Sequence, residues 1–225
     1  MCASFWFEKI FVVVVNDNYC LKKDGILIMG KWYEKRDEYK TRLIEATIKT
    51  VATVGLEQAS VDLICKNAGM NVVYVYRLFG SKDKLLLSTF EMVDTELLYF
   101  ILNNFIQIDQ SQVEFEQSCR ALLNCCWEYV VGRPDKLRFY VRYYHSAVFH
   151  ANGYDEHIKR FSVLLEKIQP AFRDNSDVTM VMHQIFETML IQSINHIAHP
   201  MGSNQAARDL CFNMVFSIAK AFRKA

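Results

Sequence analysis

Residues 71–74, Asn-Val-Val-Tyr, place one amide, two small apolar side chains and one phenol in a row. The amide of Asn71 offers a hydrogen-bond donor beside an acceptor, and an adenine edge presents the complementary pair in the major groove. Val72 and Val73 offer methyl groups that can contact the thymine methyl. Tyr74 is long enough to reach a base edge or a phosphate. If the fold places these side chains on a helix that enters the major groove, they can contact double-stranded DNA.

Two short helices are predicted to position these side chains. Val61, Ile64 and Ala68 share one helical face. A second helix has its own apolar face, made by Val75, Leu78 and Phe79. Gly69, which lies between the helices, can take the left-handed backbone conformation that a sharp turn requires. The spacing predicts a helix-turn-helix, in which the second helix enters the major groove.

Several segments around this turn form a longer pattern. They are Arg42-Leu43-Ile44-Glu45-Ala46, Gly55, Ser60-Val61, Ala68-Gly69-Met70-Asn71, Tyr76-x-x-Phe79 and Ser81-Lys82-Asp83-Lys84-Leu85-Leu86. Together they resemble the N-terminal domain of the TetR family of bacterial transcriptional regulators, over roughly residues 40–87. Val73 and Tyr74 depart from the family pattern, which commonly has Gly, Pro or Arg at the first position and Thr, Ser or Ala at the second. The departures bear on the operator sequence and leave the expected fold unchanged.

The resemblance implies phosphate contacts for three further side chains. Tyr76 and Lys82 match positions that commonly hold the DNA backbone, and Ser60 does so from the start of the second helix. Structural roles remain open for several of these residues: Ser60 and Asn71 as helix caps, Tyr76 as partly core, Lys82 as a solvated lysine and Val73 as an internal packing residue.

An all-α fold follows from the composition and from apolar spacing at helical period almost throughout. The chain has 225 residues, of which 52% are hydrophobic and only three are proline. We expect an N-terminal three-helix DNA-binding domain at residues 29–85 and a larger helical effector-binding and dimerisation domain at residues 86–225. Residues 29–85 carry a net charge of +3 and residues 86–225 carry −2. The whole chain, at +1, does not indicate nucleic-acid binding by itself.

Turn residues divide the chain into nine expected helices, the number that the resemblance also implies. The first runs from residue 34 or 37 to 54, and three more begin near Ser60, Asn71 and Ser81, the last continuing to about residue 104. The remaining five are expected at 112–131, 135–149, 155–168, 178–198 and 205–223.

Residues 1–28 form an extension with two interpretations. Met29 is the natural start in the first, because members of the family usually begin shortly before the first helix. In the second, the extension is real and packs as a strand or binds a partner. Its apolar run at residues 10–15 is too short to span a bilayer, which needs about 20 apolar residues.

The second half of the chain suggests a small-molecule effector and a homodimer. Five aromatic residues are candidates for an effector pocket: Trp127, Phe139, Tyr140, Tyr143 and Tyr144. Ordinary core packing is the alternative for each of them. The last two expected helices carry apolar side chains that call for a partner: Met182, Ile185, Met189, Ile197, Leu210, Met214, Phe216 and Ile218. The resemblance implies a homodimer through these helices, with a four-helix interface that binds a palindromic DNA operator.

Other function classes find little support. The six histidines lack the spacing of a metal site, and no phosphate loop, nucleophile elbow or dinucleotide motif is present, so we expect no cofactor, no metal and no catalysis. Seven cysteines without a Cys-x-x-Cys pair indicate a reduced, cytoplasmic chain with no membrane association. The leading interpretation is a repressor that a small molecule releases from DNA. The alternatives are a protein-interaction adaptor that has lost operator binding and, more remotely, a helical enzyme.

Overall fold

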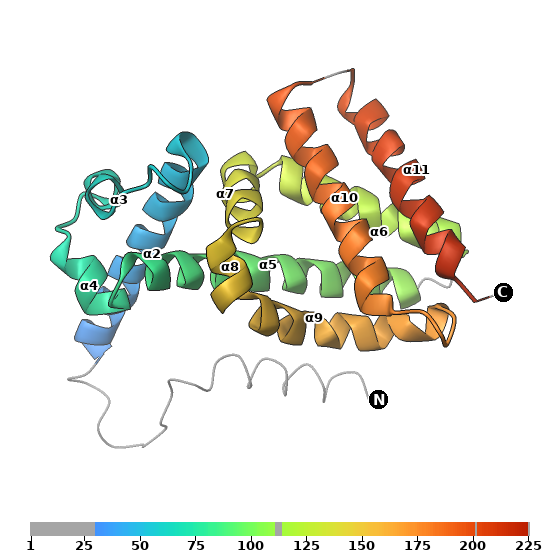
Figure 1. Ribbon diagram of the computed structural model, residues 1–225, viewed down its shortest axis with the longest axis horizontal. Helices are drawn as coiled ribbons and strands as arrows, with labels where there is room; N and C mark the ends of the chain where they lie inside the picture. The colour runs from blue at the N-terminus through green and yellow to red at the C-terminus, as the bar shows by residue number, and fades with distance from the viewer. Residues whose placement is uncertain (1–29, 111–113, 201, 225) are drawn as a thin grey trace, which may run out of the picture. The chain divides into compact units, whose positions relative to one another are not determined.

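The computed structural model describes residues 30–110, 114–200 and 202–224 (Figure 1). The extension at residues 1–28 lies outside these ranges. The chain divides into two compact units, residues 1–39 and 40–225, and the second contains almost all of the described residues. Within the described ranges every regular element is a helix, so the expected all-α fold is confirmed. None of the described helices combines the length and apolarity needed to cross a membrane.

The expected helix-turn-helix is formed by α3 and α4, preceded by α2. Their bounds are α2 Gly30–Val54, α3 Val61–Ala68 and α4 Val73–Phe79. Ser60 and Ser81 precede helices as expected: the hydroxyl of Ser60 accepts the Leu63 amide at 3.2 Å, and that of Ser81 accepts the Lys84 amide at 3.1 Å. These bonds satisfy backbone donors that a helix start leaves without an intrahelical partner.

Seven further α-helices and one 3₁₀ turn make up the remainder of the described chain. They are α5 Lys82–Gln110, α6 Phe115–Val131, α7 Pro134–Tyr144, α8 Ala147–Asn152, α9 Tyr154–Ile168, η1 Gln169–Ala171, α10 Val178–Ala198 and α11 Asn204–Phe222. α5 continues past residue 104, and it also runs without interruption through residues 85–86, where we placed a domain boundary. α10 and α11 pack against each other (Figure 1).

The single helix expected at residues 135–149 is wrong, because the structure divides it into α7 and α8. Ser146 has extended backbone angles (φ −84°, ψ 150°), and its hydroxyl accepts the Phe149 amide at 3.1 Å. A serine that caps a new helix competes with continuation of the preceding one. The described residues therefore contain ten α-helices, one more than expected for the same stretch of chain.

Helix α2 contributes to two hydrophobic cores. Leu43 and Ala46 are buried in a small core with α3, α4 and Leu85. Ile48 and Val51 lie on another part of the same helix and are buried in the large core formed with α5 to α11. The helix-turn-helix is thus anchored to the remainder of residues 40–225 by shared packing as well as by the continuous backbone of α5.

Candidate nucleic-acid interface and internal cavity

The turn between α3 and α4 has a geometry that its glycine makes accessible. Gly69 has φ +62° and ψ +38°, in the left-handed region. Its amide donates to the Lys66 carbonyl at 3.2 Å, and the Met70 amide donates to the Cys65 carbonyl at 2.9 Å. This pair of bonds is the Schellman motif, which satisfies the last carbonyls of a helix and reverses the chain.

An arginine that the sequence reasoning left without a role supports this turn. Arg42 on α2 donates from Nη2 to the carbonyl oxygen of Ala68, the last residue of α3, at 2.8 Å. A cation at a helix C-terminus also interacts favourably with the helix dipole. Arg42 therefore fixes the end of α3, and with it the start of the turn. The position of Arg42 in the pattern shared with the family could have indicated this role.

Asn71 caps α4. Its Oδ1 accepts the Val73 amide at 2.9 Å, and its carbonyl oxygen accepts the Tyr74 amide at 3.0 Å. The side-chain oxygen has a second lone pair, so the amide can still offer an acceptor beside its donor. Base recognition by Asn71 stays a prediction.

The other side chains of α4 divide between the small core and the surface. Val75 is fully buried, and Val72 and Tyr74 pack partly against the same core. Val73 is 62% exposed and Tyr76 is 58% exposed. Large apolar and aromatic surface left in solvent on a helix this short is available for contact. Core roles for Val73 and Tyr76 find no support, whereas Tyr74 is more restricted than its length suggested.

Lys82 lies at the start of α5, beside the loop between α2 and α3. Its Nζ donates to the Leu56 carbonyl at 3.4 Å, and the side chain is partly buried. The lysine is therefore neither fully solvated nor held in a carboxylate pair in the described structure.

Residues 40–85 carry seven Lys/Arg and four Asp/Glu, so this region keeps a modest positive charge that favours an anionic partner.

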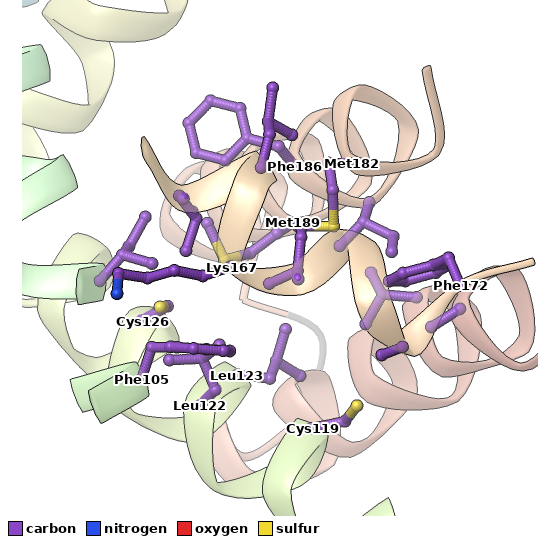
Figure 2. Close-up of a pocket in the computed structure, with 18 of the residues that line it drawn as sticks. Phe105, Cys119, Leu122, Leu123, Cys126, Lys167, Phe172, Met182, Phe186 and Met189 are labelled. Carbon is purple, nitrogen blue, oxygen red and sulfur yellow. The ribbon is translucent and has the colours of Figure 1, made fainter. Parts of the chain in front are cut away.

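A cavity of about 750 Å³, partly open to solvent, lies among α5, α6, α9, α10 and α11. Figure 2 shows Phe105, Leu122 and Leu123 along one wall and Met182, Phe186 and Met189 along the opposite wall. A cavity of this size, with mainly apolar walls and a few polar groups, has the properties of a small-molecule site.

Of the five aromatic residues expected to line an effector pocket, only Tyr144 borders this cavity. Its hydroxyl lies 3.0 Å from Nδ1 of His183, another wall residue. Trp127, Phe139, Tyr140 and Tyr143 are at most 2% exposed and are packed in the large core. Tyr140 and Tyr143 contact the ring of Phe90, and Tyr143 also contacts Phe149. Phe139 contacts Tyr143, and Trp127 contacts His196.

A buried carboxylate that the sequence reasoning missed lies next to the cavity. Asp94 is fully buried on α5 and accepts the Tyr140 hydroxyl at 2.8 Å. His157 Nδ1 lies 3.0 Å from its Oδ1, and Arg160 pairs with its Oδ2. The signal was present: Asp94 follows Phe90 and precedes Leu97 and Ile101 on one helical face, where a charged residue requires partners.

Two thiols on the cavity wall are unreactive at neutral pH. Burial raises the pKa of Cys119 to about 11 and that of Cys126 to about 12. The thiolate is the reactive form, so these cysteines pack as small apolar groups at neutral pH. All five cysteines in the described residues are free. Within those residues, no three His, Cys, Asp or Glu side chains are arranged to hold a metal ion.

The apolar side chains of α10 and α11, which we expected to form a dimer interface, divide between the cavity and the exposed surface. Met182, Ile185 and Met189 face the cavity, so the cavity accounts for their apolar character. Other large apolar side chains on these helices are exposed by 41–57%: Met180, Ile191, Leu210, Met214 and Phe222.

Comparisons with known proteins agree with this geometry. Residues 43–89 match the family described as "Bacterial regulatory proteins, tetR family". The chain is 35% identical over 69 residues to the HTH-type transcriptional regulator BetI of Vibrio campbellii, a match that covers 31% of this chain and about a third (35%) of that protein's length.

Solved structures resemble the fold over most of the chain. A TetR family transcription regulator from Marinobacter aquaeolei aligns with a TM-score of 0.63 and 20% identity, covering 83% of this chain and 97% of that one. A protein from Shewanella sp. PV-4, described as a TetR family regulator, aligns with a TM-score of 0.64 and 17% identity, covering 83% and 99%. Both similarities concern the fold.

Proposed function

Because the N-terminal domain of this chain belongs to the tetR family of bacterial regulatory proteins, we propose that the protein is a DNA-binding transcription regulator. It binds a palindromic operator as a homodimer and acts as a repressor that a small-molecule effector releases. The observation that carries the proposal is the capped turn at Gly69 followed by α4, which leaves Val73 and Tyr76 exposed on the helix that would enter the major groove.

The contacts divide into those that read bases and those that hold the backbone. Asn71, Val73 and Tyr74 are the candidates for base edges, with Val72 beside them at the start of α4. Tyr76 and Lys82 are candidates for phosphate contacts, as is Ser60, whose position at the start of α3 also places backbone amides near a phosphate. Phosphate contacts set register and affinity, whereas base contacts set sequence preference.

Selection of bound duplexes from random DNA, followed by affinity measurements between 50 and 200 mM salt, tests this function. We expect a palindrome. Tyr76→Phe and Lys82→Ala should weaken binding to all sequences, and Lys82→Ala should reduce the salt slope by roughly one. Lys159→Ala is the matched control, because Lys159 is an exposed lysine on α9 that pairs with Glu156 on the same helix. A folded protein that selects no motif and binds DNA without salt dependence would support the adaptor function instead.

The exposed apolar side chains on α10 and α11 support a homodimer through these helices. In such a dimer the two copies of α4 must lie about 34–36 Å apart to enter successive major grooves. Leu210→Glu combined with Met214→Glu places charges on this surface and should give a monomer by light scattering. Gln205→Glu, also exposed on α11, should remain dimeric. A double variant that stays dimeric would place the interface elsewhere.

Two helices support a connection between the cavity and the helix-turn-helix. α5 borders the cavity at Ile101 and Phe105 and buries Leu85 in the small core. α7 borders it at Tyr144, and two residues earlier Arg142 hydrogen-bonds the Val51 carbonyl near the end of α2. A ligand that prefers one arrangement of these helices would shift the spacing of the two DNA-binding helices. Operator affinity with and without a saturating ligand measures this coupling.

A further inference from the structure

The cavity is elongated along helices that run beside it. On α6 the wall extends from Phe115 to Cys126, and on α9 from His157 to Ile168. Each interval contains twelve residues, and the eleven steps between them span roughly 16 Å at about 1.5 Å per step. A zig-zag alkyl chain with bonds of about 1.5 Å advances roughly 1.25 Å per carbon, so about twelve carbons fit along this length.

Polar groups near Tyr144 already have partners within the protein. Tyr144 pairs with His183, and His157 pairs with Asp94. A charged group placed among them would lose its hydration without gaining an opposite charge, which is costly. This part of the cavity therefore suits an uncharged ligand segment.

A second, polar chamber, which is open to solvent, adjoins the cavity where Glu114 and Arg223 line both spaces. It has a volume of about 500 Å³ and shares four lining residues with the first cavity: Glu114, Phe115, Phe216 and Arg223. The guanidinium of Arg223 lies 4.2 Å from the ring centroid of Phe115, so it borders both spaces. The remaining wall of the chamber consists of Glu116, Gln117, Arg120 and Lys220.

The cations of this chamber differ in whether a carboxylate pairs with them. Arg120 pairs with Asp209 at 3.3 Å and with Glu116 at 3.9 Å. Within the described residues, no carboxylate lies within 4.0 Å of the charged nitrogens of Lys220 or Arg223. Both side chains are exposed, so the chamber offers two solvent-facing cations that can form charge-assisted hydrogen bonds with an incoming anion.

We propose that the two adjoining spaces form one site for an amphiphile, with an unbranched acyl chain of about twelve carbons in the apolar cavity and an anionic head beside Lys220 and Arg223. The proposal rests on the effector site of the preceding subsection and specifies the chemistry that the site selects. The same chemistry occurs in free fatty carboxylates and in acyl thioesters of phosphorylated carriers.

Calorimetric titration of the full chain, in the absence of DNA, tests the tail first. Octanoate, dodecanoate and hexadecanoate are added below their micelle concentrations, and dodecanoate should bind tightest with one molecule per chain. Leu122→Trp fills part of the cavity wall shown in Figure 2 and should move the optimum to a shorter chain. Equal affinity for all three, or an optimum that Leu122→Trp leaves in place while circular dichroism shows a folded protein, would overturn the tail assignment.

The head is tested with dodecanol, which keeps the chain and removes the charge. Dodecanol should bind about tenfold more weakly than dodecanoate. Lys220→Ala and Arg223→Ala should each weaken dodecanoate about tenfold and leave dodecanol unchanged. Lys167→Ala is the matched control, because Lys167 borders the apolar cavity and not the chamber, and its effect should stay below threefold. Equal binding of acid and alcohol, or equal losses in all three variants, would overturn the anionic head.

Dodecanoyl-coenzyme A in the same titration distinguishes the two sources. Binding at least tenfold tighter than dodecanoate assigns the site to a phosphorylated thioester, and weaker binding assigns it to the free carboxylate. Because these affinities are measured without DNA, a protein that binds the amphiphile and selects no operator would refute the regulator function alone. A protein that selects an operator and binds none of the probes would refute the ligand alone.

Discussion

Replacing Asp94 with Asn should destabilise the protein by about 3 kcal/mol. The carboxylate of Asp94 is fully buried and accepts from Tyr140 at 2.8 Å, from His157 at 3.0 Å and from Arg160. Removing one member of a buried ion pair typically costs about 3–5 kcal/mol, because the remaining charge loses its compensation. Arg160 is also 3.9 Å from Glu91 and partly exposed, so the lower end of that range applies.

Urea unfolding measures this loss, with the two proteins compared at equal concentration because dimerisation contributes to apparent stability. In a thermal melt, 3 kcal/mol corresponds to a decrease of roughly 6–12 °C for a chain of this size. Glu156→Gln is the control, since Glu156 pairs with Lys159 at 3.7 Å on the surface, with 62% and 78% of the two side chains exposed. That pair should contribute less than about 1 kcal/mol. If Asp94→Asn cost no more than Glu156→Gln, the buried network would not have the energetic role inferred from its geometry.

Two further predictions concern coupling and reactivity. Arg142→Ala removes the bond to the Val51 carbonyl, so the ligand-induced change in operator affinity, measured by fluorescence anisotropy, should fall at least threefold. Arg138→Ala is the control, because it removes only a surface ion pair on the same helix and should respond like the original protein. An unaltered response in both variants would exclude α7 as the coupling element. Burial raises the pKa of Cys119 from 9.0 to about 11, so at pH 8 this residue has about a hundredfold less thiolate than an ordinary thiol. Its alkylation, followed by mass spectrometry, should be slower by a similar factor in the native protein and should reach the normal rate in urea. Labelling of the native protein as fast as that of a free thiol would contradict this burial.

The helix-turn-helix could be predicted from sequence because local rules determine it. Ser60 as a cap, Gly69 in a left-handed turn and Ser81 before the next helix each depend on residues within a few positions along the chain. The apolar faces around Ile64 and Val75 were predicted for the same reason, since helical periodicity alone assigns them.

The cavity could not be predicted in the same way. Whether an aromatic residue borders an empty space or fills it depends on helices distant in sequence, and Tyr143 and Tyr144, which are adjacent, differ in this respect. The wall residues of α9 and α10 look like ordinary core positions in the sequence. Asp94 is different, because its charge on an apolar face could have indicated the buried network.

The double role of α2 has a consequence for how such proteins diversify. Leu43 and Ala46 serve one core, whereas Ile48 and Val51 serve the other. A recombination event that joined residues 1–85 to a foreign C-terminal half would bring along side chains shaped for packing that is no longer present, and would leave the Val51 carbonyl without Arg142. For the regulator proposed above, new pairings of operator sequence and effector should therefore arise by point substitution within one gene more readily than by exchange of gene segments.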